Sequence, residues 1–120
     1  MKLVRAADAQ AYVAAGHAGV SAFRLQGPEA SQAGDFWIGL SVYEAGGIAE
    51  RGMGDTVKAY VVLEGELTVT GGDGMKHILR RHDSCLIEPF EMREVVNASG
   101  APAILLVIAS RHRRPAADTG

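Results

Sequence analysis

The sequence is poor in cysteine and has no excess of charge of either sign. Cys85 is the single cysteine among 120 residues, so an intramolecular disulfide is excluded and we expect a cytoplasmic protein. The formal net charge of -2 gives no electrostatic footprint for nucleic acid. The one basic cluster, "RHRRP" at 111–115, falls in a terminal segment that we interpret as solvated.

Long apolar runs are also missing. Polar residues such as Arg5, Asp8 and His17 interrupt the apolar residues near the N-terminus, and no run approaches the length of a membrane span. We therefore expect no membrane association and no export. With 48% hydrophobic residues, a chain of this length is predicted to form one domain with one core.

Glycine is abundant, and it recurs between short apolar runs. This pattern is typical of many strands joined by tight turns. The predicted strands cover 20–26, 35–43, 58–70, 75–81, 84–88, 93–97 and 102–110. "EAGG" is predicted to end the second strand, and "GGDG" at 71–74 to supply the positive φ angles of a hairpin. The fold class expected from this spacing is all-β, a barrel or a sandwich.

The predicted organisation is one barrel with two terminal extensions. Residues 1–19 are expected to form an N-terminal arm, residues 20–110 the β-barrel domain, and residues 111–120 a flexible C-terminal tail. Within the arm, the alanine-rich segment 6–15 is consistent with a short helix capped by Asp8, or with an extended arm.

Three segments resemble the small single-domain cupins of the germin-like and RmlC-like superfamily. They are "LSVYEAGG" (40–47), "YVVLEGELTV" (60–69) and "HDSCLIEPFEMREVVN" (82–97). The resemblance implies a cupin-type antiparallel β-barrel, or jelly roll, over about residues 36–109. In that family two histidines and a glutamate in a first motif, with a third histidine in a second, hold a metal ion.

The resemblance breaks at those metal ligands. If Gly65 is placed on the closing glycine of the first motif, the four ligand positions become Gly52, Gly54, Lys58 and Arg93. Glu94 takes the last position if the turn carries one extra residue, but Arg93 keeps the spacing to Asn97. Lysine and arginine donate hydrogen bonds only and repel a divalent ion. We therefore expect no metal and no cofactor.

Lys58 and Arg93 are the principal candidates for an anion site. In the cupin register Lys58, Tyr60 and Val62 face the barrel interior, although a lysine at a strand edge is commonly solvated. Arg93 suits a carboxylate clamp, although for Arg93 alone an ion pair with Glu88, Glu91 or Glu94 is a slightly better explanation. Two inward cations need an acidic counter-charge, supplied by the protein or by a ligand.

The remaining candidates follow from their place in the motifs. Glu50 and Arg51 lie in the loop that replaces the histidine pair, so they are expected at the barrel mouth. Tyr60 is a hydrogen-bond donor to an oxyanion or a packed core tyrosine. Trp37 belongs to an aromatic wall of a pocket or of a subunit interface. Glu44 and Glu88 are further acidic candidates for proton transfer, and a solvated turn residue is the commoner case for each.

Two functional hypotheses follow. The first is a metal-independent enzyme that binds a small organic acid through Lys58, Arg93, Trp37 and Arg51. It would catalyse isomerisation, tautomerisation or decarboxylation of a keto or enol acid, with Lys58, Glu50 and Tyr60 as catalytic residues. The second is a non-catalytic cupin that binds an anionic metabolite or a partner. In either case apolar strands such as "AILLVIA" (103–109) favour a homodimer.

Overall fold

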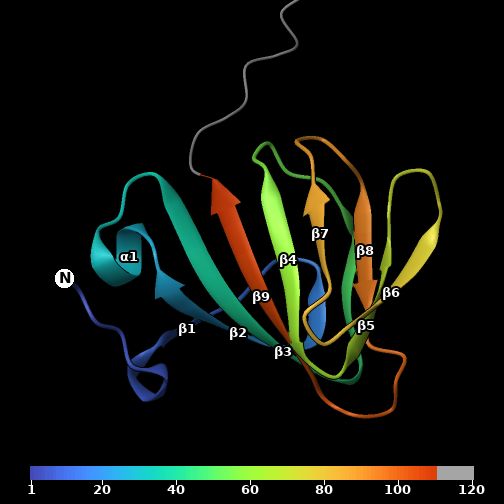
Figure 1. The fold of residues 1–120 in the computed structure, drawn as a ribbon, viewed down its shortest axis with the longest axis horizontal. Coiled ribbons are helices and arrows are strands. Elements are labelled where there is room, and N and C mark those ends of the chain that lie inside the picture. Colours follow the sequence, from blue (N-terminus) through green and yellow to red (C-terminus); the bar gives the residue numbers. More distant parts are fainter. Residues whose placement is uncertain (111–120) are drawn as a thin grey trace, which may run out of the picture.

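Antiparallel strands wrap into a nearly closed barrel in the computed structural model, which describes residues 1–110 (Figure 1). The predicted tail at 111–120 lies outside the described residues. The elements are η1 (Ala6–Asp8), β1 (Gln10–Tyr12), β2 (His17–Gln26), α1 (Pro28–Ser31), β3 (Phe36–Gly52), β4 (Lys58–Glu64), β5 (Glu66–Thr70), β6 (Lys76–Arg80), β7 (Ser84–Ile87), β8 (Arg93–Val96) and β9 (Ala103–Ser110). The strand order is β6-β5-β8-β3-β9-β4-β7, with β2 paired to β3 and β1 paired to β2. The all-β, cupin-type prediction is confirmed.

β3 runs through the segment where a turn was predicted. Its first half pairs with β9 and its second half with β8. Gly46 has φ +79, and a Cβ on Gly47 would lie 2.5 Å from the Gly19 carbonyl oxygen. These two glycines let the strand bend and cross closely over β2, so it passes from one side of the barrel to the other without ending. The prediction that "EAGG" ends the strand is wrong for this reason.

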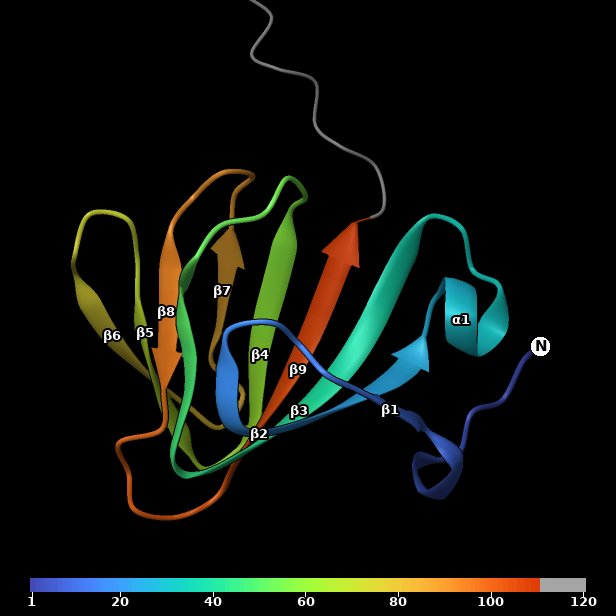
Figure 2. The ribbon, with the colours of Figure 1, turned by 180° about the vertical axis from the view of Figure 1, so that it is seen from behind.

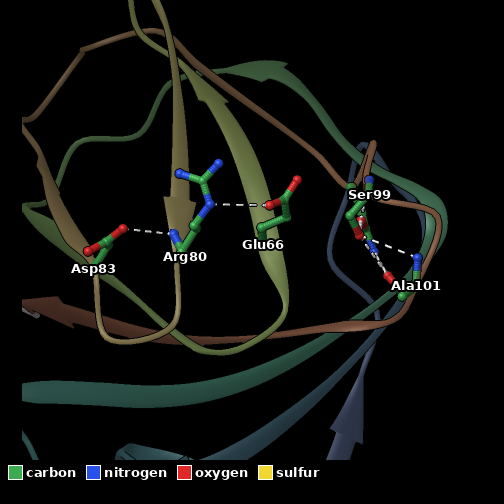
Figure 3. Close-up of polar contacts among 6 residues, drawn as sticks. Glu66, Arg80, Asp83, Ser99 and Ala101 are labelled. Atoms are coloured by element: carbon green, nitrogen blue, oxygen red, sulfur yellow. Dashed lines mark hydrogen bonds and ion pairs between the residues drawn. The ribbon is translucent and has the colours of Figure 1, made fainter.

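Gly65 divides the predicted strand 58–70 into β4 and β5. Its φ is +75, and a Cβ there would meet the Pro102 carbonyl oxygen at 2.7 Å, so only glycine fits. β4 pairs with β9 and β7, whereas β5 pairs with β8 and β6. The predicted hairpin after β5 is confirmed. Beyond it, Arg80 Nε lies 3.5 Å from Glu66 Oε2 across the β5–β6 pair (Figure 3).

The N-terminal segment is extended. The only helical residues near the predicted helix 6–15, within the described part of the chain, form the three-residue turn η1, so the helical alternative is wrong. β1 lies beside β2 (Figure 2), and the register of the pair puts Tyr12 opposite Ala22. Long-range pairing outweighs the helix propensity of the alanines here. Among residues 1–110, no helix is long and apolar enough to cross a membrane.

The side chains that point into the barrel from β3, β4, β5, β8 and β9 form one core. The largest side chains that are fully buried are Tyr43, Leu67, Leu105, Val62, Val95 and Asn97. Tyr60 and Val62 are both buried, at 4% and 0% exposure, which confirms the predicted direction of β4. Because alternate residues of a strand face opposite sides, the residues between them lie on the outer face.

The outer face of β4, β9 and the first half of β3 is apolar. Its outward positions are Ala59, Val61 and Leu63 on β4, Ile104, Leu106 and Ile108 on β9, and Phe36, Ile38, Leu40 and Val42 on β3. None of these ten side chains is charged, and none is buried. A sheet that faces water on one side normally alternates apolar and polar residues, so this outer sheet face is unusual.

We predict that the outer sheet face packs against a second copy of the chain. A two-fold contact brings the same patch against itself, and an uncharged patch meets no like charge there. Light scattering is expected to give about twice the 12.6 kDa chain mass. Leu106→Glu, at the centre of the face, should yield monomers. Ile78→Glu, exposed on the edge strand β6, is the matched control; monomers from that variant alone would place the contact at the sheet edge.

Candidate functional site

A cavity of about 240 Å³ lies between the inward side chains of β2, β3, β9, β4 and β8. Its long lining side chains are Tyr12, Arg24, Trp37, Lys58, Tyr60 and Arg93. Space remains between them because β3 carries small residues at inward positions, Gly39 and Ser41. A Cβ on Gly39 would come within 3.0 Å of the Tyr12 hydroxyl oxygen. The glycine therefore lets the Tyr12 side chain reach over the sheet.

Arg93, Tyr60 and Lys58 form a polar cluster at one end of the cavity. Arg93 Nε donates to the Tyr60 hydroxyl oxygen at 2.9 Å, and Arg93 Nη1 donates to the Glu50 carbonyl oxygen at 2.7 Å. The strand register explains why Arg93 reaches the Glu50 carbonyl, because Arg93 on β8 pairs with Gly52 on β3. The same three side chains also line a small hollow of about 10 Å³, which is bounded by Glu88 and Glu91.

Burial and the Arg93 charge set the protonation of this cluster. Burial lowers the pKa of Lys58, the Arg93 charge lowers it further, and Asp55 opposes both effects. Burial raises the pKa of the Tyr60 hydroxyl, which the Arg93 charge and hydrogen bond partly offset. Tyr60 is therefore a neutral hydroxyl at physiological pH, and its own proton can be donated to a ligand oxygen. Lys58 gives up its proton more readily than a solvated lysine does.

We expect Lys58→Met to stabilise the empty protein at pH 7. The folded protein holds the Lys58 proton less tightly than the unfolded chain, so the charged form costs stability below the folded pKa. That cost disappears as the pH rises from the folded pKa toward 10.5, the ordinary value. The gain should be at most about 1 kcal/mol, because the ammonium is partly solvated. Urea unfolding at pH 7 and pH 10 measures it; a large loss of stability at pH 7 would show a structural ion pair instead.

The structure gathers four of the sequence candidates and separates two. Lys58, Tyr60, Arg93 and Trp37 all line the cavity. Glu50 contributes its backbone carbonyl, while its residue is exposed and its carboxylate does not line the cavity. Arg51 is likewise exposed and lines neither this cavity nor the small hollow. The second half of β3 is strand rather than a loop at the barrel mouth. A register shift between Ala49 and Gly52 interrupts the regular alternation there, and Arg51 is left exposed.

Three residues of the N-terminal part were missed from the sequence. Tyr12, His17 and Arg24 line the cavity. The inward direction of Arg24 could have been predicted from the sequence. Arg24 lies two residues after the buried Ala22 in the strand "VSAFRLQ", so the two side chains share a face. The position of Tyr12 could not have been predicted in this way, because it depends on the pairing of β1 with β2, which involves residues far apart along the chain.

The comparisons with known proteins assign the fold to one family. Residues 39–109 match the family model described as "Cupin domain", and the chain therefore belongs to the cupin family. It is 47% identical over 107 residues to "Beta-D-galactosidase Rv1717" of Mycobacterium tuberculosis, which covers 89% of this chain and 91% of that protein.

Solved structures share the fold at low sequence identity. The polyketide cyclase RemF of Streptomyces resistomycificus superposes with a TM-score of 0.82 at 21% identity, covering 96% of this chain and 82% of that one. KdgF of Halomonas sp. superposes with a TM-score of 0.78 at 12% identity, covering 94% and 96%. A sugar phosphate isomerase of Silicibacter pomeroyi gives 0.68 at 24% identity, covering 78% and 60%.

The side chains at the metal position of the cupin framework do not suit a metal. A Cβ on Gly52 would lie 3.6 Å from Arg93 Nη1, and a Cβ on Gly54 would lie 3.6 Å from Lys58 Nζ. The two cationic heads thus extend over the positions from which the family's histidines project. Within residues 1–110 no three His, Cys, Asp or Glu side chains gather to hold an ion. A guanidinium and an ammonium repel a divalent ion there.

Proposed function

We propose that this cupin binds a small organic acid in the barrel cavity, with Lys58 and Arg93 as the anion site. The observation that carries the proposal is the charge of the lining. Three cationic side chains, Arg24, Lys58 and Arg93, face the cavity, and none of the described residues that line it is Asp or Glu. Cations that face a cavity without a carboxylate need an anion to offset their desolvation.

The same cluster supports proton transfer on a keto or enol acid. In this scheme Arg93 would hold the carboxylate, and the Tyr60 hydroxyl would donate to the oxygen that gains charge as an enolate forms. The lowered pKa of Lys58 makes its neutral form easier to reach. In that form Lys58 would accept a proton from the carbon next to the keto group and return it to another carbon. Glu50, expected from the sequence to assist, has its carboxylate outside the cavity and takes no part in this scheme.

Calorimetry and NMR with the intact chain test this proposal. Pyruvate, 2-oxoglutarate and their hydroxy-acid analogues should bind, and the matched neutral amides should not. For an enzyme, NMR in deuterated buffer should show exchange of the protons on the carbon next to the keto group, and Lys58→Met should abolish this exchange. Binding without exchange would leave the non-catalytic alternative. Equal binding of acids and amides would overturn the anion site.

A second candidate, hydrolysis of a β-D-galactoside, is supported by the 47% identical relative that carries this activity in its name. Glycoside hydrolysis generally needs two carboxylates beside the scissile bond. Glu88 and Glu91 line the small hollow next to Lys58, Tyr60 and Arg93, and the Glu88 backbone N–H donates to Glu91 Oε1 at 3.0 Å. In this scheme one carboxyl group protonates the oxygen of the leaving group. The other, as a carboxylate, assists the attack of water on the anomeric carbon.

Chromogenic galactosides separate the two candidates. Hydrolysis of 4-nitrophenyl β-D-galactoside, with the α-anomer inert, would favour the second. Glu88→Gln and Glu91→Gln should then each reduce kcat by about a hundredfold or more. Glu94→Gln is the matched control, because Glu94 lines neither the cavity nor the hollow. No turnover of the β-anomer by freshly purified protein would remove this candidate and leave the acid-binding proposal intact.

A further inference from the structure

We propose that Arg24 forms a second anion subsite, at the opposite end of the cavity from Lys58 and Arg93, so that the protein selects ligands with two negatively charged ends. This inference rests on the proposed acid binding and narrows it to a substrate class. Dicarboxylic acids, or acidic sugars that carry a second anionic group, are the compounds that fit.

The way Arg24 is held supports a binding role. Its guanidinium carbon lies 3.8 Å from the centre of the Tyr12 ring and 5.0 Å from the centre of a Trp37 ring. Contacts of this kind with aromatic rings leave the N–H donors of a guanidinium able to bind another partner. No hydrogen bond or ion pair joins Arg24 to another residue within 1–110. An arginine that is held by two aromatic rings, borders the cavity and has unpaired donors within the described residues is prepared for an oxyanion.

The sheet register separates the two cationic ends. Arg24 pairs with Gly39, Gly39 with Val107, and Val107 with Tyr60, so these residues form one row across β2, β3, β9 and β4. From β2 to β4 there are three strand spacings, which amount to about 14 Å across the sheet. The Arg93 guanidinium bonds the Tyr60 hydroxyl at one end of this row, and Arg24 stands at the other. Of the two residues between them, Val107 lines the cavity, whereas the Tyr12 hydroxyl and the Trp37 ring cover Gly39. A chain that connects the two ends would therefore run through the cavity beside these two rings.

A structural role for Arg24 is the competing explanation. Arg24 also borders a separate cavity, which Asp8 and Glu29 line. Neither carboxylate forms an ion pair with Arg24 within the described residues. If they nevertheless balance its charge, replacing either of them should change stability as much as replacing Arg24, and ligand selection should not depend on any of the three.

Calorimetry with a matched set of acids tests the subsite. Hexanoate has one carboxylate, adipate has two on a chain of the same length, and hexane-1,6-diol has none; succinate and suberate vary the length. Adipate or suberate should bind roughly tenfold or more tightly than hexanoate, as expected for one added charge-assisted contact. In Arg24→Gln this ratio should fall to about one, and Arg24→Lys should restore part of it.

The controls distinguish the second anion subsite from the proposed acid binding on which it rests. Asp8→Asn, Glu29→Gln and the exposed-turn variant Arg81→Gln should keep the wild-type ratio. Equal affinity of wild-type protein for adipate and hexanoate, or an unchanged ratio in Arg24→Gln, overturns the second subsite and leaves the first in place. Failure of wild-type protein to bind any of the acids overturns both.

Discussion

Asn97→Ala is expected to lose about 3–5 kcal/mol of folding free energy, because Asn97 joins three backbone segments in the core. Its side chain is fully buried. Nδ2 donates to the carbonyl oxygens of Tyr43, Glu44 and Ala101, at 3.2, 3.1 and 2.7 Å. Oδ1 accepts from the Ser99 N–H and hydroxyl, at 3.1 and 2.7 Å. Alanine would leave several of these groups buried without partners.

The loss should appear as a fall in melting temperature of roughly 10–20 °C. Ser99→Ala removes one donor of the same network and should cost about 1 kcal/mol (Figure 3). Ala98→Ser, exposed beside Asn97, is the control and should change little. Scanning calorimetry measures all three. A shift below about 3 °C in Asn97→Ala would mean that water replaces the lost side chain, contrary to this account.

The Asn97 network also matters for the site. It holds the chain at Tyr43 and Glu44, where β3 bends, and Tyr43 lines the cavity. The backbone repeats the connection, because the Asn97 N–H donates to the Gly47 carbonyl oxygen at 2.9 Å. Asn97 could be identified from the sequence only as an anchor of the resemblance. Two of its partners, the carbonyls of Tyr43 and Glu44, are more than fifty residues away along the chain, and no local pattern reveals them.

Local patterns predicted most strands and failed at the glycines. β6, β7, β8 and β9 lie within one residue of their predicted bounds, and the turn of the β5–β6 hairpin follows residue 70 as predicted. Gly46 and Gly47 were interpreted as a turn but bend a continuous strand, and Gly65 was placed inside a strand but ends one. A glycine permits a turn, a bulge or a close crossing, and long-range packing decides among them.

The site residues within 39–109, the part of the chain that matches the family model, include those predicted from the sequence. The site residues that precede this part were missed, apart from Trp37. Lys58 and Arg93 were expected to converge, and both line the cavity and the small hollow. Arg24 and Tyr12 come from strands that precede residue 39, where the match to the family begins. Only the pairing of β1 and β2 with β3 brings them to the cavity.

Arg93→Met is expected to weaken binding of a small carboxylate by about thirtyfold or more. The variant removes the planar donor group and also frees the Tyr60 hydroxyl and the Glu50 carbonyl from their hydrogen bonds. Tyr60 then loses the contact that fixes its orientation. Arg93→Lys keeps the charge without the two-pronged geometry, so we expect an intermediate loss of roughly tenfold. Calorimetric titration with pyruvate or adipate measures these affinities directly.

The control for Arg93 is its neighbour in the barrel wall, Arg51, which the sequence placed at the ligand and the structure leaves exposed. Arg51→Met removes the same charge from the protein, so any general electrostatic effect on anion binding should appear equally in both variants. If the cavity is the site, Arg51→Met should bind acids as the wild type does, at low and at physiological ionic strength. Equal losses in the two variants would instead locate the acid on the outer rim, and unchanged affinity in Arg93→Met would exclude the cluster as its site.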